Sequence, residues 1–176
     1  MTRRVLPGLL FAVLAAGCGA ASSTAGPLGP APTGGSAQCI PDSNRTPVTV
    51  GETVFQNKSN EKLLIQKITL HDARNVTLLH TFVTPGDKEV IGNYFSYPPP
   101  ERQLPKGVKL DTWRRAAGYV VQPHKWFGPI TAVQPTPKAR HGSYASTGMD
   151  IIYSYEGSQY TLNTKFTVQL KIGSDC

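Results

Sequence analysis

Residues 149–172 read MDIIYSYEGSQYTLNTKFTVQLKI, and this stretch decides the fold class. Two segments rich in β-branched and aromatic residues, 149–155 and 160–172, flank the sequence Glu156-Gly157-Ser158-Gln159, which is typical of a hairpin turn. From Phe166 onward, apolar and polar residues alternate strictly. A period of two is the pattern of a half-buried antiparallel strand, so the stretch predicts a β-hairpin with one face in a core.

Similar short segments recur upstream, at residues 62–70, 76–84, 119–121 and 130–133, with a further pair around Gly51. Proline-rich sequences separate several of them, and no segment has the pattern of a long helix. Charged residues make up only 16% of the chain, which also has 17 glycines and 15 prolines, and this composition disfavours a coiled coil or a helical bundle. About seven short strands at this spacing predict an all-β domain over residues 39–176, an antiparallel immunoglobulin-like β-sandwich.

The first residues of the chain have the order of an export signal. Arg3 and Arg4 precede a short apolar run that ends in small residues before Cys18. This run is shorter than the roughly 20 apolar residues that span a bilayer, so residues 1–17 are predicted to be a signal peptide. Residues 2–6, TRRVL, loosely resemble a twin-arginine signal, and the choice between the general secretory and the twin-arginine route stays open.

The sequence Leu14-Ala15-Ala16-Gly17-Cys18 resembles the lipobox of bacterial lipoproteins. The resemblance implies cleavage before Cys18 and acylation of its sulfur, and hence an anchor in membrane lipid on the extracytoplasmic face of the cell membrane. The alternative is ordinary cleavage nearby, which leaves Cys18 as a spare thiol. In its general pattern, the domain also resembles the small β-sandwich lipoproteins of high-GC Gram-positive bacteria, a resemblance that brings no catalytic residues with it.

The chain has three cysteines, an odd number for an exported protein. If Cys18 carries lipid, Cys39 and Cys176 remain, and they flank the predicted domain. A disulfide between them closes a loop of more than a hundred residues, for which the chain-entropy model gives about 5 kcal/mol. The alternative is two free buried cysteines. Residues 18–38, mostly Gly, Ala, Pro and Ser with Leu28 as the one large apolar residue, are predicted to form a flexible linker.

No motif of a known catalytic or metal centre is present. The chain lacks a Gly-x-Ser-x-Gly elbow, and Ser59-Asn60-Glu61-Lys62 matches Ser-x-x-Lys without the other penicillin-binding motifs, so it is interpreted as a polar turn. The residues considered as metal ligands lack the spacing of a metal site. They are His71, His80, His124, His141, Asp72 and Met149. The sequence therefore predicts no cofactor, no metal and no enzymatic activity.

Basic and aromatic residues give the remaining signals. Without Arg3 and Arg4 the chain has 16 basic and 11 acidic residues, a net charge of +5. Lys106, Lys109, Arg114 and Arg115 surround Trp113. This cluster is interpreted as a solvated face above a buried tryptophan. The alternative is a surface for anionic head groups or wall polymers; nucleic acid is not expected outside the membrane.

Residues 92–111 form a segment too long for a simple hairpin, and Tyr94, Phe95 and Tyr97 make it rich in aromatic residues. These rings either form a contact surface for a sugar or a partner protein, or fold back to cover an open end of the sandwich. The predicted function is a non-catalytic interaction or structural module at the cell envelope, in an undetermined oligomeric state. Two rivals stay open, an envelope enzyme and a solute- or metal-binding lipoprotein in which His71 and His80 face each other across a hairpin.

Overall fold

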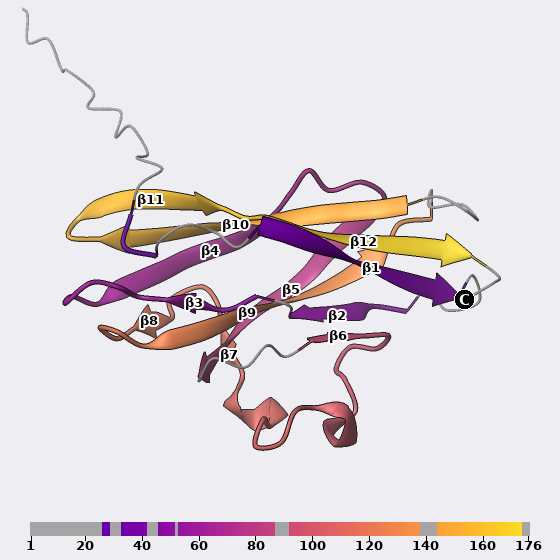
Figure 1. Ribbon diagram of the computed structural model, residues 1–176, viewed down its shortest axis with the longest axis horizontal. Helices are drawn as coiled ribbons and strands as arrows, with labels where there is room; N and C mark the ends of the chain where they lie inside the picture. The colour runs from indigo at the N-terminus through magenta and orange to yellow at the C-terminus, as the bar shows by residue number, and fades with distance from the viewer. Residues whose placement is uncertain are drawn as a thin grey trace, which may run out of the picture.

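The computed structural model describes residues 26–28, 33–41, 46–51, 53–86, 92–137 and 144–173. These residues form two β-sheets that pack face to face (Figure 1). The strands are β1 (Thr33–Pro41), β2 (Val48–Gly51), β3 (Phe55–Gln56), β4 (Leu63–His71), β5 (Val76–Gly86), β6 (Gly92–Tyr94), β7 (Arg114–Arg115), β8 (Val120–Val121), β9 (Trp126–Pro135), β10 (Tyr144–Tyr155), β11 (Ser158–Asn163) and β12 (Lys165–Gly173). Two short 3-10 turns, η1 (Glu101–Gln103) and η2 (Leu110–Thr112), lie between β6 and β7.

Sheet I has the strand order β1-β12-β10-β4-β8, with β11 also paired to β10, and sheet II has the order β6-β2-β9-β5-β7, with β3 also paired to β9. All pairs are antiparallel except β1 with β12, which is parallel. The predicted all-β antiparallel sandwich is confirmed. The strand segments outnumber the seven or so that were predicted, because β6 and β7 are pieces of two or three residues without a periodic signal, β1 lies largely in the predicted linker, and the predicted strand 160–172 is divided into β11 and β12.

The predicted hairpin is confirmed as β10 and β11, but its closing strand is not continuous. After Tyr160 the chain pairs with β10 as β11, the pairing is interrupted at Thr164, and β12 then pairs with β10 again. At the interruption, the Thr164 hydroxyl accepts a hydrogen bond of 2.9 Å from the Met149 amide. Along β12 the predicted alternation holds, since Val168 and Leu170 are buried while Gln169 is exposed.

The core lies between the two sheets. Its larger cluster joins Ile65 and Ile151 of sheet I to Val83 and Phe127 of sheet II, and all four side chains are buried. A smaller cluster around Val48 continues the same layer. Both clusters collect residues from strands far apart in the sequence, which is the arrangement of a sandwich rather than of two independent hairpins. Within the described ranges, no helix is both long and apolar enough to cross a membrane.

The structure differs from the predicted linker at two segments. Residues 26–28 pack on the end of the sandwich, where Leu28 is only 3% exposed and belongs to the larger core cluster. Residues 33–41 form β1, which adds a parallel edge strand to sheet I. Of the predicted linker, residues 26–28 thus contact the core and residues 33–38 pair with β12. One buried leucine and a run of backbone hydrogen bonds stabilise a segment whose composition alone offers little to bury.

The segment between β6 and β7 covers the outer face of sheet II (Figure 1). Successive residues of a strand point to opposite faces, and Phe127 and Val133 of β9 point into the core, so Ile130 and Ala132 point outward. Both are nevertheless completely buried. The covering segment is fastened by a hydrogen bond of 2.7 Å that the Thr49 hydroxyl donates to the Ser96 carbonyl. The sheet thus has packed side chains on both faces.

Candidate functional site

Four rings pack together on the outer face of sheet II. The Tyr97 ring lies 5.3 Å from His80 and 6.1 Å from Phe82, and Phe82 lies 5.9 Å from Trp113, measured between ring centroids. We call these four residues the aromatic cluster. They come from β5, from the segment after β6 and from the residue before β7. Such distances are within the range of favourable aromatic contacts.

The local sequence explains how the strands position these rings. His80 and Phe82 are two residues apart on β5, so they project from the same face, opposite to the buried Val83. β7 then pairs with β5, Arg115 opposite Phe82 and Arg114 opposite Val83. This pairing brings Trp113 beside Phe82.

A hollow of about 540 Å³, open to solvent, lies beside the cluster. It is lined by Leu79, His80, Thr81, Phe82, Tyr97, Arg115 and Ala117. Its volume falls within the range of small-molecule sites, about 300–1,000 Å³. The lining combines rings, including the His80 imidazole, with one guanidinium, a group that pairs well with anions.

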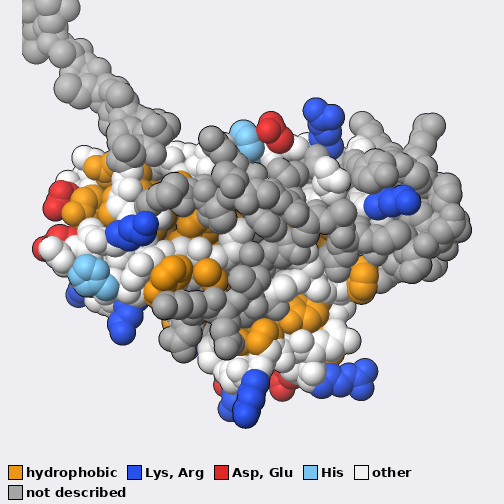
Figure 2. Space-filling model, in the orientation of Figure 1, with side chains coloured by type: hydrophobic (Ala, Val, Ile, Leu, Met, Phe, Trp, Pro, Cys, Tyr) orange, Lys and Arg blue, Asp and Glu red, His pale blue; other side chains and the backbone are white. Residues whose placement is uncertain are grey.

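The basic residues near the hollow have no acidic partner among the described residues. Arg114 Nη1 donates hydrogen bonds to the carbonyls of Asp111 and Trp113, at 2.6 and 3.1 Å. The ion pairs found between described residues both involve His71, and neither includes Arg114 or Arg115. In Figure 2, basic side chains project from the lower edge of the molecule, with acidic ones between them. The Arg115 side chain is therefore a cation available to a ligand.

The three residues predicted to form a contact loop have different environments. Tyr94 is half-buried, and its hydroxyl donates a hydrogen bond to the Gln103 carbonyl at 3.0 Å. Phe95 is 49% exposed and does not line the hollow, whereas Tyr97 joins the aromatic cluster. Burial raises the pKa of both tyrosines above the ordinary value of 10.0, so their hydroxyls remain protonated at neutral pH. The loop therefore contributes Tyr97 to the candidate site.

His71 and His80 do not share a site. His71 ends β4 in sheet I, whereas His80 lies on β5 in sheet II, so the predicted pairing of the two across a hairpin is wrong. The turn between β4 and β5 joins the two sheets instead of joining neighbouring strands of one sheet. A metal site built on both histidines is therefore not formed.

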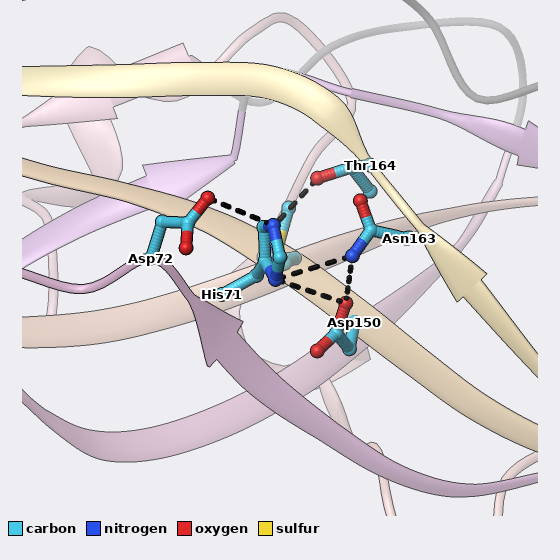
Figure 3. A network of polar contacts seen from close by, with 6 residues as sticks. His71, Asp72, Asp150, Asn163 and Thr164 are labelled. Atoms are coloured by element: carbon cyan, nitrogen blue, oxygen red, sulfur yellow. Dashed lines mark hydrogen bonds and ion pairs between the residues drawn. The ribbon is translucent and has the colours of Figure 1, made fainter.

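His71 instead belongs to a polar network on sheet I (Figure 3). Its Nε2 lies 2.9 Å from Asp72 Oδ2, and its Nδ1 lies 3.1 Å from Asn163 Nδ2 and 3.8 Å from Asp150 Oδ1. Because the amide nitrogen can only donate, Nδ1 is the acceptor for Asn163, and Nε2 faces Asp72. The two carboxylates thus sit at opposite ring nitrogens and do not converge.

The side chains of this network pair with one another around the imidazole and do not converge on a common point. The Thr164 hydroxyl beside it is buried and already accepts the Met149 amide hydrogen. Among the described residues, no three His, Cys, Asp or Glu side chains are grouped so that they could hold a metal ion. We interpret the network as a structural connection between β4, β10 and β11.

The Ser-x-x-Lys sequence is a turn, as predicted. Ser59 Oγ lies 2.7 Å from Asn57 Oδ1 and 2.8 Å from the Glu61 carbonyl. Asn57 is completely buried, and its amide group donates to the carbonyls of Glu61, Val121 and Gln122. These bonds use the polar atoms of the turn to connect it to the end of β8.

Of the three cysteines, Cys18 and Cys176 lie outside the described residues, so lipidation and the disulfide stay predictions. Cys39 lies on β1, opposite Lys171 of β12. Phe82 was not predicted as part of a site, whereas His80 was considered only as a metal ligand and Arg115 only as part of a basic surface around Trp113. The spacing of two between His80 and Phe82 within a predicted strand was the one available signal, since it places both rings on one face.

No protein-family model matches this chain, and no curated protein matches it.

Proposed function

We propose that this chain is an exported lipoprotein, anchored through Cys18 at the extracytoplasmic face of the membrane, whose β-sandwich is a non-catalytic binding module. The observation that carries the proposal is the open hollow beside the aromatic cluster, lined by rings and by Arg115 without a carboxylate. Half-buried rings of this kind supply contact area at a low entropic cost, because neighbouring rings already hold them in place. The lipobox resemblance supports the anchor.

The docking of residues 26–28 bears on how such an anchor works. A chain that begins at Cys18 has eight residues before Gly26 packs on the sandwich. Eight extended residues reach at most about 28 Å. The domain is then held close to the membrane, with the end that carries Leu28 nearest to it. The aromatic cluster lies on the outer face of sheet II, whereas Leu28 packs in the core between the two sheets.

The disulfide between Cys39 and Cys176 is part of the proposal. The parallel pairing of β1 with β12 places Cys39 opposite Lys171 and Pro41 opposite Gly173, so the bridge requires the last three residues to turn back toward Cys39. Reduction should lower the free energy of unfolding by about 2–5 kcal/mol. Urea unfolding with and without reductant measures the difference, and a Cys39→Ser and Cys176→Ser double variant that is insensitive to reductant is the control.

The anchor and the bridge are tested by the intact mass of the protein from the membrane fraction. We expect a chain that begins at Cys18, heavier by a lipid, and lighter by two hydrogens until it is reduced. A soluble chain without lipid contradicts the anchor.

The binding role is tested by cross-linking in intact cells. We expect an envelope partner that the wild-type protein captures and Tyr97→Ala loses, while Phe95→Ala, a substitution of an exposed ring in the same segment, retains it. Capture that is unchanged by Tyr97→Ala contradicts the proposed surface.

A further inference from the structure

We infer that the hollow binds a negatively charged polysaccharide, with a sugar ring stacked on Tyr97 and an acidic group on Arg115. The inference rests on the proposed function, since it names the ligand of the same surface. Three features of the hollow carry it: a fixed ring platform, an opening to solvent, and a cation without a counter-charge.

The ring platform is fixed before any ligand binds. Tyr97 packs against both His80, at 5.3 Å, and Phe82, at 6.1 Å, and a tilt of 24° makes its contact with Phe82 nearly stacked. The Tyr97 side chain is only partly buried, so part of the ring faces the hollow. An aromatic face suits the C–H face of a pyranose ring, and a side chain already immobilised loses little entropy on binding.

The opening distinguishes a saccharide from a small apolar ligand. Ligands in small-molecule sites typically lose 70–90% or more of their surface to the protein. A hollow open to solvent cannot enclose a ligand to that extent, and an apolar molecule would keep much of its surface in water. A saccharide instead keeps its outward hydroxyl groups hydrated while one ring face packs on the protein. It can also extend from the hollow as part of a longer chain.

The charge of the surface selects an anionic chain. Arg115 lines the hollow, and the adjacent Arg114 is exposed as well. The segment between β6 and β7 adds three exposed cations, Arg102, Lys106 and Lys109, against two exposed carboxylates, Glu101 and Asp111. Within the described part of the chain, no carboxylate forms an ion pair with any of them. Guanidinium groups bind carboxylates and phosphates through charge-assisted hydrogen bonds, so an acidic sugar gains both a bond to Arg115 and attraction from its neighbours.

The test uses the full-length protein in detergent and three polymers, which differ in whether they carry sugar rings, negative charge or both. Polygalacturonate offers sugar rings with carboxylates, its methyl ester offers the same rings without charge, and polyphosphate offers charge without rings. We expect titration calorimetry to show polygalacturonate binding at least about tenfold more tightly than either control, and less tightly as salt is raised.

Substitutions of residues that line the hollow test whether polygalacturonate binds there. We expect Tyr97→Ala and Arg115→Gln each to weaken polygalacturonate binding about tenfold or more. Two matched substitutions outside the hollow, Phe95→Ala and Arg74→Gln, the latter at an exposed arginine in the turn between β4 and β5, should change it less than about twofold. Because Arg115 is exposed, Arg115→Gln keeps the test valid if Tyr97→Ala disturbs folding.

If the methyl ester binds as tightly as polygalacturonate, the proposed role of charge is wrong. If polyphosphate binds as tightly as polygalacturonate, the proposed role of the sugar ring is wrong. Absence of polygalacturonate binding at about 1 mM, with a cross-linked protein partner still lost in Tyr97→Ala, overturns the saccharide and leaves the proposed function intact. Absence of both a saccharide and a partner that depends on Tyr97 overturns the proposed function too.

Discussion

Two irregular segments cover the sandwich, and they do so differently. Residues 26–28 close one end, with Leu28 almost completely buried, the Pro27 carbonyl accepting the Lys58 amide at 3.1 Å, and Gly26 so close that a Cβ there would overlap the Tyr153 hydroxyl. The segment between β6 and β7 covers sheet II but leaves Tyr97 half-buried beside an open hollow. The surface under residues 26–28 is therefore already covered by the protein's own residues. The second segment leaves ring area and positive charge for another molecule.

The comparison predicts that the end closed by residues 26–28 contributes more to stability than the covered face. Leu28→Ala should lower the free energy of unfolding by about 2–5 kcal/mol, because it removes a buried side chain from the larger core cluster. Urea unfolding measures it. Leu64→Ala, the same substitution at a side chain that is 38% exposed, is the control. Equal losses in the two variants would mean that residues 26–28 are not docked in solution.

The second prediction concerns the fastening of the covering segment. Thr49→Val keeps the shape of a completely buried side chain but removes the donor to the Ser96 carbonyl, which should cost about 1–2 kcal/mol. Hydrogen exchange should accelerate around residues 95–97 and remain unchanged around β10 and β11. Uniform acceleration throughout the protein would show that the covering segment does not open on its own.

The third prediction concerns the hydroxyl that contacts the docked segment. Tyr153→Phe removes a hydrogen bond with the Leu28 backbone and should cost about 0.5–1.5 kcal/mol at pH 7. Burial raises the pKa of Tyr153 from 10.0 to about 12. The folded state therefore keeps its proton between pH 10 and 12, where the unfolded state loses it, and stability falls as pH rises through this window.

The Tyr153→Phe variant lacks this ionisation, so the advantage of the wild-type protein should shrink between pH 10 and 12. Urea unfolding at several pH values measures it. An advantage that stays constant or grows over that range contradicts the burial of the hydroxyl.

The smallest effect on stability is expected in the hollow itself. Arg115→Gln should change the free energy of unfolding by less than about 0.5 kcal/mol, because the side chain is exposed and forms no ion pair within the described residues. A thermal unfolding curve compared with that of Arg102→Gln checks this. A large loss of stability would give Arg115 a structural role and weaken the contrast between the two segments.

The candidate site was predictable only in part. The aromatic residues of segment 92–111 were recognised, and Arg115 was noted beside Trp113, but the sequence treats Tyr94, Phe95 and Tyr97 alike. Their different environments arise because the Thr49–Ser96 hydrogen bond fixes the start of the loop against sheet II, and Tyr97 then meets His80 and Phe82. Such contacts join residues far apart in the chain, which no local pattern encodes.

The sequence by itself determined the all-β class and the hairpin of β10 and β11, because alternation along a strand and the residues of a turn are local properties. Only the tertiary structure decided that Leu28 enters the core, that β4 and β5 lie in different sheets, and that Tyr97 joins the hollow. Each of these three features depends on which apolar surface remains uncovered after the two sheets have packed together. That surface is formed by residues far apart in the chain, so it exists only in the assembled core.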